Sequence, residues 1–228
     1  PHHENEIAQS VCATGEEFVK CWMHTGPLRI DKEKMSKSLD NFITVKEALK
    51  EFSSEVIRFF LISNHYRSPL NYSEEGVLEA RNSLDRLYTS LIGLDTKKEK
   101  PSDDADLISP FKKAMEDDFN VPSALAALFE IVKSINLAKE NGNTKEANVL
   151  GATLVNLSEP LGILQQKTKD YFQLGAILSN EEIQSMIDER NKARDSKDFE
   201  LSDKIRDSLL EKGIVLEDTD KGTTWKVQ

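Results

Sequence analysis

The chain has 228 residues, of which 38% are hydrophobic and 31% charged, and its formal net charge is −10. This balance is typical of a soluble protein of two or three modules, and no run of eighteen apolar residues occurs, so we expect no transmembrane segment. The acidic charge disfavours a nucleic-acid binder that relies on charge alone, but it allows one that uses a local basic face and specific base contacts.

The start of the chain is expected to contain short elements and a polar loop. Residues 2–12 predict a short helix. Residues 18–30 are aromatic and β-rich with a Gly-Pro break, and they favour a pair of strands. Residues 31–43 are polar and favour a loop.

Three helices are then predicted from their N-terminal caps. A capping box at residues 44–47 starts the first, Ser54 caps the second, and Ser73 starts the third, in which apolar residues recur at helical spacing. Residues 93–106 are polar and charged, so they form the clearest predicted linker.

The middle of the chain predicts an antiparallel helical bundle. Helices are expected to begin near Pro110, Pro122 and Thr144, because proline favours a first helical turn and short loops join antiparallel neighbours. Residues 165–178 form a second predicted linker.

A smaller unit is predicted at the C-terminal end. Ser179 opens a capping box and a helix, and a second helix over about residues 199–211 ends at Gly213. Residues 214–216 and 223–225 then favour a small hairpin.

The most specific motif is the string Lys34-Met35-Ser36-Lys37-Ser38, between a predicted strand and a predicted helix. Two lysines and two hydroxyls suit a polyphosphate, because ammonium groups stabilise charge that moves onto a departing pyrophosphate. An arbitrary pair of lysines would be interpreted as a solvated basic loop. The full string instead resembles the KMSKS loop of class I aminoacyl-tRNA synthetases, although Asp40 stands where they usually have Gly; Asp tolerates a left-handed backbone.

A second motif places His2 and Glu6 one helical turn apart. This spacing suits shared metal ligation, but such a pair taken alone is more often an ordinary surface pair. Cys12 and Cys21 could be completing ligands, yet their separation fits no common zinc spacing, and we expect both to be small buried side chains. Two cysteines are too few for a disulfide framework, which favours a cytoplasmic protein.

Together the motifs resemble the cysteinyl-tRNA synthetase family. The likeness covers essentially the whole chain, in residues 1–42, 54–61, 65–73, 117–122 and 190–225. It implies a cysteine–tRNA ligase, which forms cysteinyl-adenylate from L-cysteine and ATP with Mg²⁺ and then transfers cysteine to tRNA-Cys. The KMSKS-like string would contact ATP, with Lys34 and Lys37 acting on the phosphates.

The resemblance also implies a zinc ion held by two cysteines, a histidine and a glutamate, of which His2 and Glu6 match the last two. Zinc would bind the substrate thiolate and so distinguish cysteine from serine. The two cysteine ligands and the ATP-contacting HIGH motif lie upstream in the family. Because the chain begins with Pro1 inside a motif, we expect it to be the C-terminal portion of such an enzyme and inactive in isolation.

In the family, the terminal domain reads the GCA anticodon. Motif matching assigns Arg194, Asp203 and Asp218 to base contacts and Phe199 to packing or stacking, since carboxylates, guanidinium groups and aromatic rings suit unpaired bases. The ordinary alternative is that the two aspartates cap helices or turns and that Arg194 forms a surface ion pair.

The expected fold is mainly α. Residues 1–45 would be the remnant of a Rossmann-like catalytic domain with the KMSKS loop, and residues 46–95 a helical connecting domain that contacts the tRNA stem. Residues 96–165 would form an antiparallel helical-bundle anticodon-binding domain, and residues 166–228 a small C-terminal α/β domain that reads the anticodon. We expect a monomer with no membrane partner.

Two other functions stay open at this point. The chain could be only a tRNA-binding module without catalysis, because half of the family's active site is missing from it. Alternatively, the parent could be a cysteine ligase that acts on a small amino-sugar acceptor, although a terminal domain ending in Trp225 argues against an enzyme that has no anticodon to read.

Overall fold

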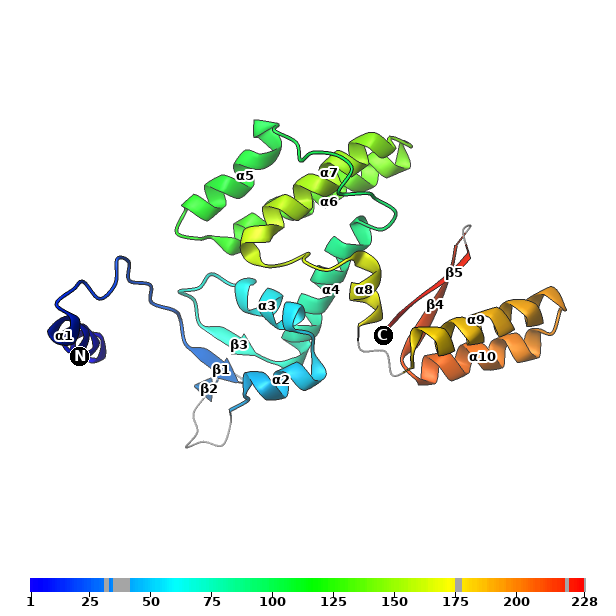
Figure 1. The fold of residues 1–228 in the computed structure, drawn as a ribbon, viewed down its shortest axis with the longest axis horizontal. Helices are drawn as coiled ribbons and strands as arrows, with labels where there is room; N and C mark the ends of the chain where they lie inside the picture. Colours follow the sequence, from blue (N-terminus) through cyan, green and yellow to red (C-terminus); the bar gives the residue numbers. More distant parts are fainter. Residues whose placement is uncertain (31–32, 35–41, 175–177, 220–221, 228) are drawn as a thin grey trace.

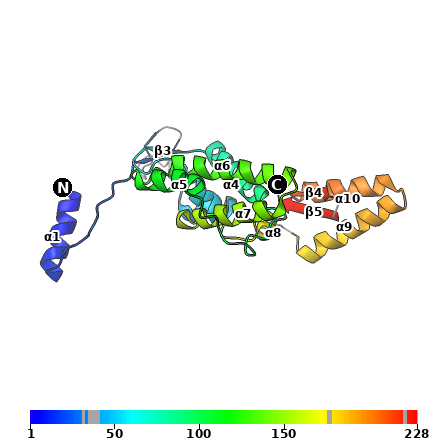
Figure 2. The ribbon, with the colours of Figure 1, turned by 90° about the horizontal axis from the view of Figure 1, so that it is seen from above.

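The computed structural model describes residues 1–30, 33–34, 42–174, 178–219 and 222–227. Its elements form an elongated, mainly helical molecule (Figures 1 and 2). The helix α1 (His2–Thr14) lies at one end, and α9 (Asn180–Asp195) and α10 (Phe199–Glu211) lie at the other. The predicted N-terminal helix is therefore confirmed.

A small mixed sheet follows α1. The strand β1 (Leu28–Ile30) pairs antiparallel with β2 (Glu33–Lys34) and parallel with β3 (Leu70–Tyr72), in the order β2-β1-β3. Parallel pairing needs a crossover connection. The helices α2 (Val45–Glu51) and α3 (Ser54–Ile62) provide it, so the sheet and these two helices form one unit.

The prediction of a strand pair within residues 18–30 is partly wrong. Residues 15–27 contain neither helix nor strand, and only the last three residues of the predicted pair enter the sheet. The Gly26 amide donates to the Tyr66 carbonyl at 2.8 Å, and a Cβ on Gly26 would lie 2.2 Å from the Ser68 carbonyl oxygen. The glycine of the Gly-Pro break therefore lets this segment lie close to the loop that contains Tyr66 and Ser68. The local sequence pattern does not reveal this contact.

The helices that follow begin at polar caps. Thr44 and Glu47 exchange the two hydrogen bonds of a capping box, as predicted. The prediction that Ser54 caps α3 is wrong by one residue, because the cap is Ser53. The extended backbone of Ser53 lets its hydroxyl accept a hydrogen bond from the third residue of the helix. Ser73 caps α4 (Glu74–Ser90), as predicted.

The predicted bundle is built from α5 (Ala105–Glu116), α6 (Val121–Glu140) and α7 (Thr144–Ser158), with the 3₁₀ helix η2 (Glu159–Leu161) after them. Among the described helices, α6 is the one that is long and apolar enough to cross a membrane. It instead contacts α4, α5 and α7, and one face of it, which carries Leu128, Ile131 and Ile135, lies in their shared core, as in the core helix of a globular domain.

Two boundary predictions in this region are wrong. Pro110 lies inside α5, whose N-cap is Asp104, so the helix loses one backbone hydrogen bond at the proline and continues. The predicted linker at 165–178 contains α8 (Thr168–Gln173), because Tyr171 buries its ring against Tyr88 of α4. The linker predicted at 93–106 has no helix or strand before Ala105, but it is docked on α7: the Asp95 amide donates to Asn148 at 3.0 Å.

The C-terminal unit has its own core. The helices α9 and α10 cover the antiparallel hairpin of β4 (Ile214–Thr219) and β5 (Gly222–Val227), and the predicted helices and hairpin are confirmed. Seven buried apolar residues form this core: Ile183, Ile187, Ile205, Leu209, Ile214, Leu216 and Trp225.

A buried carboxylate connects the segments around α4. Glu55 of α3 is 5% exposed and accepts hydrogen bonds from the Tyr88 hydroxyl (3.0 Å), the Leu164 amide (2.5 Å) and the Gln166 side-chain amide (2.9 Å). A buried carboxylate is tolerated when its oxygens are satisfied in this way. It therefore joins α3, α4 and the chain that leaves the bundle.

We expect Glu55→Ala to lower the free energy of unfolding by about 3 kcal/mol, because the change leaves several buried donors without an acceptor. Urea denaturation at neutral pH measures the loss. The matched control is Glu79→Ala, which removes an exposed carboxylate from α4 and should change stability by less than about 0.5 kcal/mol. Equal stability of the two variants would contradict the role given to Glu55.

Candidate nucleotide and nucleic-acid interface

The first lysine of the KMSKS-like string lies on the edge strand of the sheet. Lys34 ends β2, and its backbone pairs with Arg29 of β1. Four members of the predicted ATP loop lie outside the described part of the chain: Met35, Ser36, Lys37 and Ser38. Their contact with ATP stays a prediction, and so does the left-handed backbone suggested for Asp40, which also lies outside the described residues.

The candidate zinc ligands lie on α1. His2 and Glu6 are both exposed and one helical turn apart, so they fit two positions of a tetrahedral shell. Within the described ranges, no group of three or more His, Cys, Asp or Glu is placed to hold a metal ion. These residues therefore do not form a zinc site by themselves. His3 instead contacts the rings of Trp22 and His24.

The prediction that Cys12 and Cys21 are buried is wrong, because both are exposed. No residue of α1 is buried, and the segment that holds Cys21 has no regular structure. The apolar character of cysteine does not bury its side chain when the segment that carries it does not pack against the described core.

Two of the residues predicted to read the anticodon, Arg194 and Asp218, meet at one surface of the C-terminal unit. Asp218 of β4 accepts two hydrogen bonds from Arg190 (3.0 and 2.8 Å) and one from Arg194 (3.0 Å). Across the hairpin, the Thr223 hydroxyl also donates to Asp218 at 2.8 Å. This carboxylate therefore holds two guanidinium groups of α9 in fixed positions.

Burial divides the roles of the two arginines. The Arg190 side chain is 5% exposed, whereas the Arg194 side chain is 47% exposed and can meet an incoming ligand. The hydrogen bonds from Arg190 and then Thr223 hold the pKa of Asp218 far below its usual range. The bond to Asp218 raises the pKa of Arg190, and the nearby charge of Asp203 adds to this.

Asp203 and Phe199 lie on the same helix. Asp198 is the N-cap of α10, so Asp203, which lies inside that helix, does not cap it. Both Asp203 and Phe199 are exposed, and Phe199 is 62% exposed at the first turn. The structure thus places Arg194, Asp218 and Asp203 around Arg190, with Phe199 on the first turn of α10.

Arg190 and Thr223 are two members of this cluster to which the sequence analysis gave no role. Arg190 and Arg194 are four residues apart and so share one face of α9, a signal available from spacing. Thr223 could be found only from the hairpin register, which places it opposite Asp218.

A second polar contact joins the loop after α3 to the turn between α5 and α6. Asp118 accepts a hydrogen bond from the Tyr66 hydroxyl at 2.7 Å and pairs with Arg67 at 2.8 Å. Asp118 and Phe119 both have positive φ values, 51° and 54°, which are strained for residues other than glycine. The contacts of Asp118 help to hold this turn.

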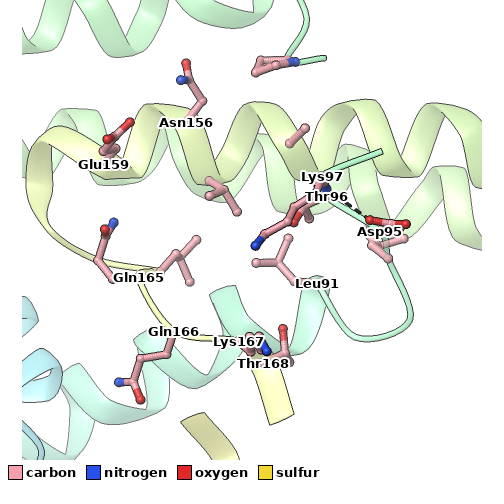
Figure 3. A pocket seen from close by; sticks show the side chains of 15 residues that line it. Leu91, Asp95, Thr96, Lys97, Asn156, Glu159, Gln165, Gln166, Lys167 and Thr168 are labelled. Carbon is pink, nitrogen blue, oxygen red and sulfur yellow. Dashed lines mark hydrogen bonds between the residues drawn. The ribbon is translucent and has the colours of Figure 1, made fainter. Parts of the chain in front are cut away.

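A pocket of about 620 Å³, lined by both polar and apolar side chains, lies beside α7 (Figure 3). The end of α4 and the docked linker line one side, and the segment around Gln165 and Lys167 lines another. None of its fifteen lining residues is a histidine or cysteine.

Three family models match the chain in order. The class I (C) catalytic domain of tRNA synthetases matches residues 1–82, the DALR domain residues 110–165, and the cysteinyl-tRNA ligase anticodon binding domain residues 180–225. The chain therefore belongs to the class I aminoacyl-tRNA synthetases.

Within that class, its relatives are cysteine–tRNA ligases. The Shewanella sediminis enzyme is 49% identical over 227 residues, the Marinobacter nauticus enzyme 48% over 228, and the Yersinia enterocolitica enzyme 49% over 229. Each alignment covers 99% of this chain and 49% of the relative, so the chain spans about half the length of the curated relatives it matches. The chain belongs to the cysteinyl-tRNA synthetase family, which confirms the resemblance seen in its motifs.

A solved ternary complex of a leucyl-tRNA synthetase from Agrobacterium radiobacter is also similar. It covers 60% of this chain and 20% of the other, with 22% identity and a TM-score of 0.48, which is too low to support an argument.

We expect Asp218→Asn to lower the free energy of unfolding by about 1–2 kcal/mol at pH 7, because Arg190 would keep a buried guanidinium beside a neutral partner. The folded-state pKa of Asp218 is lowered, so its contribution is complete above the unfolded value of about 4 and declines as the pH falls further. Urea denaturation at pH 7 and at pH 3 should therefore show a smaller difference at pH 3.

The control for this prediction is Glu200→Gln, which breaks an exposed ion pair with Lys204. It should change stability little at either pH. An Asp218→Asn variant as stable as wild type at pH 7 would contradict the buried pairing with Arg190.

Proposed function

We propose that the protein is a cysteine–tRNA ligase, which activates L-cysteine with ATP and Mg²⁺ and transfers it to tRNA-Cys. The observation that carries this proposal is the ordered match to a catalytic, a DALR and an anticodon binding domain at about 49% identity over the whole chain. The match to an anticodon binding domain disfavours an amino-sugar ligase. We further propose that the protein acts in the cytoplasm as a monomer.

Activation would take place near the small sheet. Lys34 ends the edge strand β2, and the string continues beyond it to Lys37. Two ammonium groups on this segment would bind the ATP phosphates and stabilise the charge that forms on pyrophosphate.

The division into units at residues 1–45, 46–95, 96–165 and 166–228 stays part of this proposal. We also propose that the full-length protein binds a zinc ion, to which His2 and Glu6 would supply two ligands.

Anticodon reading would take place at the Asp218 cluster. Arg194 is half-exposed and held by Asp218, so its remaining N–H groups can donate to an acceptor edge of a base. Asp203 presents an exposed carboxylate that can accept from guanine or cytosine, and Phe199 presents an exposed ring for stacking.

A second candidate function is tRNA binding without catalysis, which the matches to a DALR domain and an anticodon binding domain also support. Cysteine-dependent ATP–pyrophosphate exchange separates the two functions. Exchange by the full-length protein supports the ligase, whereas anticodon stem-loop binding by a full-length protein that gives no exchange would support the binding module.

We expect Lys37→Ala in the full-length protein to raise the barrier for adenylate formation by about 3 kcal/mol, the scale of one lost electrostatic stabiliser. Pre-steady-state adenylate formation measures this effect, and the Kd for cysteine should barely change. The control Lys133→Ala removes a lysine that pairs with Glu130 on α6 and should leave the rate unchanged. An equal loss of rate and cysteine affinity in Lys37→Ala would instead indicate a folding defect.

We expect Asp203→Ala to reduce the preference for a GCA stem-loop over one with a changed first base by about 1–3 kcal/mol, because a base-edge acceptor is lost. Fluorescence anisotropy of labelled stem-loops at moderate salt gives the two Kd values. The control Asp207→Ala removes an exposed carboxylate one turn further along α10. A GCA preference that survives in Asp203→Ala would exclude this contact.

A further inference from the structure

We propose that one face of α4 positions the anticodon-reading unit, and that Tyr171 and Asp85 are positioning residues that make aminoacylation depend on the anticodon. This face consists of Arg81, Asp85 and Tyr88, hereafter the α4 seat. The inference rests on the proposed function and deepens it. It concerns residues of α4 and α8 that have no role in the activation or anticodon contacts proposed above.

Tyr171 attaches α8 to the α4 seat by two independent contacts. Its ring stacks on Tyr88 with centroids 3.8 Å apart and an interplanar angle of 13°, and its hydroxyl donates to Asp85 at 2.6 Å. Burial, followed by the bond to Asp85, raises the pKa of Tyr171, so the hydroxyl stays a donor. Stacking and a directional hydrogen bond together restrict how this ring, and hence α8, can rotate.

The α4 seat reaches the C-terminal unit through β5. The helix α8 contacts both α4 and β5, and Arg81 donates to the Val227 carbonyl of β5 at 3.5 Å. β5 pairs with β4 along six residues and places Thr223 opposite Asp218. The position of the Asp218 cluster relative to α4 therefore depends on contacts made at the seat.

The other end of α4 reaches the sheet that carries Lys34. α4 begins directly after β3 at the Ser73 cap and contacts that strand. β3 pairs with β1, and β1 pairs with β2, which ends at Lys34. In Figure 1, α4 runs between β3 and α8, so one packed helix joins the two proposed sites.

Tyr88 also fixes α4 to its surroundings. Its hydroxyl donates to Glu55 and accepts from the Gln166 amide at 3.2 Å, just before α8 begins. The chain between Gln166 and Tyr171 is thus held to α4 at both ends. Packed, hydrogen-bonded elements of this kind transmit displacement because they do not deform continuously.

The test uses Tyr171→Phe in the full-length enzyme, which keeps the stacking and removes the bond to Asp85. The readout is the ratio of kcat/KM for aminoacylation of tRNA-Cys with a GCA anticodon to that with a changed first base. We expect this ratio to fall about fivefold, the lower range of coupling between sites. Cysteine-dependent pyrophosphate exchange and the Kd of the isolated GCA stem-loop should stay at wild-type values.

Three further variants sharpen the test. Asp85→Ala should lower the ratio as Tyr171→Phe does, whereas Asp85→Asn keeps an acceptor oxygen and should retain most of it. The control Tyr66→Phe removes another tyrosine hydroxyl, the one that donates to Asp118 away from the seat. It should leave the ratio unchanged.

An unchanged ratio in Tyr171→Phe and Asp85→Ala would overturn the inference. An equal loss of kcat/KM for both tRNAs together with weaker pyrophosphate exchange would also overturn it, because that result indicates general destabilisation. So would a rise in the Kd of the stem-loop that accounts for the whole effect. A wild-type enzyme without any GCA preference would instead overturn the proposed anticodon reading, and that result is seen before any variant is made.

Discussion

The buried carboxylate of Glu55 is the constraint on which the arrangement of this molecule depends. A carboxylate that is 5% exposed must have its oxygens satisfied by donors within the protein. Those donors come from Tyr88 of α4 and from Leu164 and Gln166, more than one hundred residues further along the chain. The requirement brings α3, α4 and the end of the bundle to one point.

This meeting point determines where the rest of the chain can go. Once the segment at Leu164 and Gln166 is held, α8 follows at a set distance and Tyr171 reaches the ring of Tyr88. The main core extends from Ala48 to Tyr171, whereas the C-terminal unit buries a separate group of apolar side chains. The terminal unit therefore folds around its own core but takes its position from the surface of α4.

Charge is arranged locally and not as a general attraction. The chain is acidic overall, so binding to arbitrary polyanions is disfavoured, and phosphate contacts alone would give little affinity. At the C-terminal unit, however, the single carboxylate of Asp218 holds two guanidinium groups, that of Arg190, which is buried, and that of Arg194, which is half-exposed. In the anticodon reading that we propose, such a site would use contacts that depend on base identity more than contacts that depend on charge.

Local patterns in the sequence determined most helices, because capping boxes and helical apolar spacing depend only on neighbours. The starts at Thr44, Ser73 and Ser179 followed from side chains that bond their own first turn, and the motifs alone indicated the synthetase family. The same local logic misplaced the start near Pro110, since it could not see that Asp104 offered an earlier cap.

Only the tertiary structure decided contacts between segments that are distant in sequence. It showed that Cys12 and Cys21 are exposed, that Tyr171 turns a polar linker into a docked helix, and that Thr223 faces Asp218. The spacing of residues on one element is written in its own sequence. Which side chain of another element meets them depends on strand register and on how whole helices pack, and no local pattern contains that information.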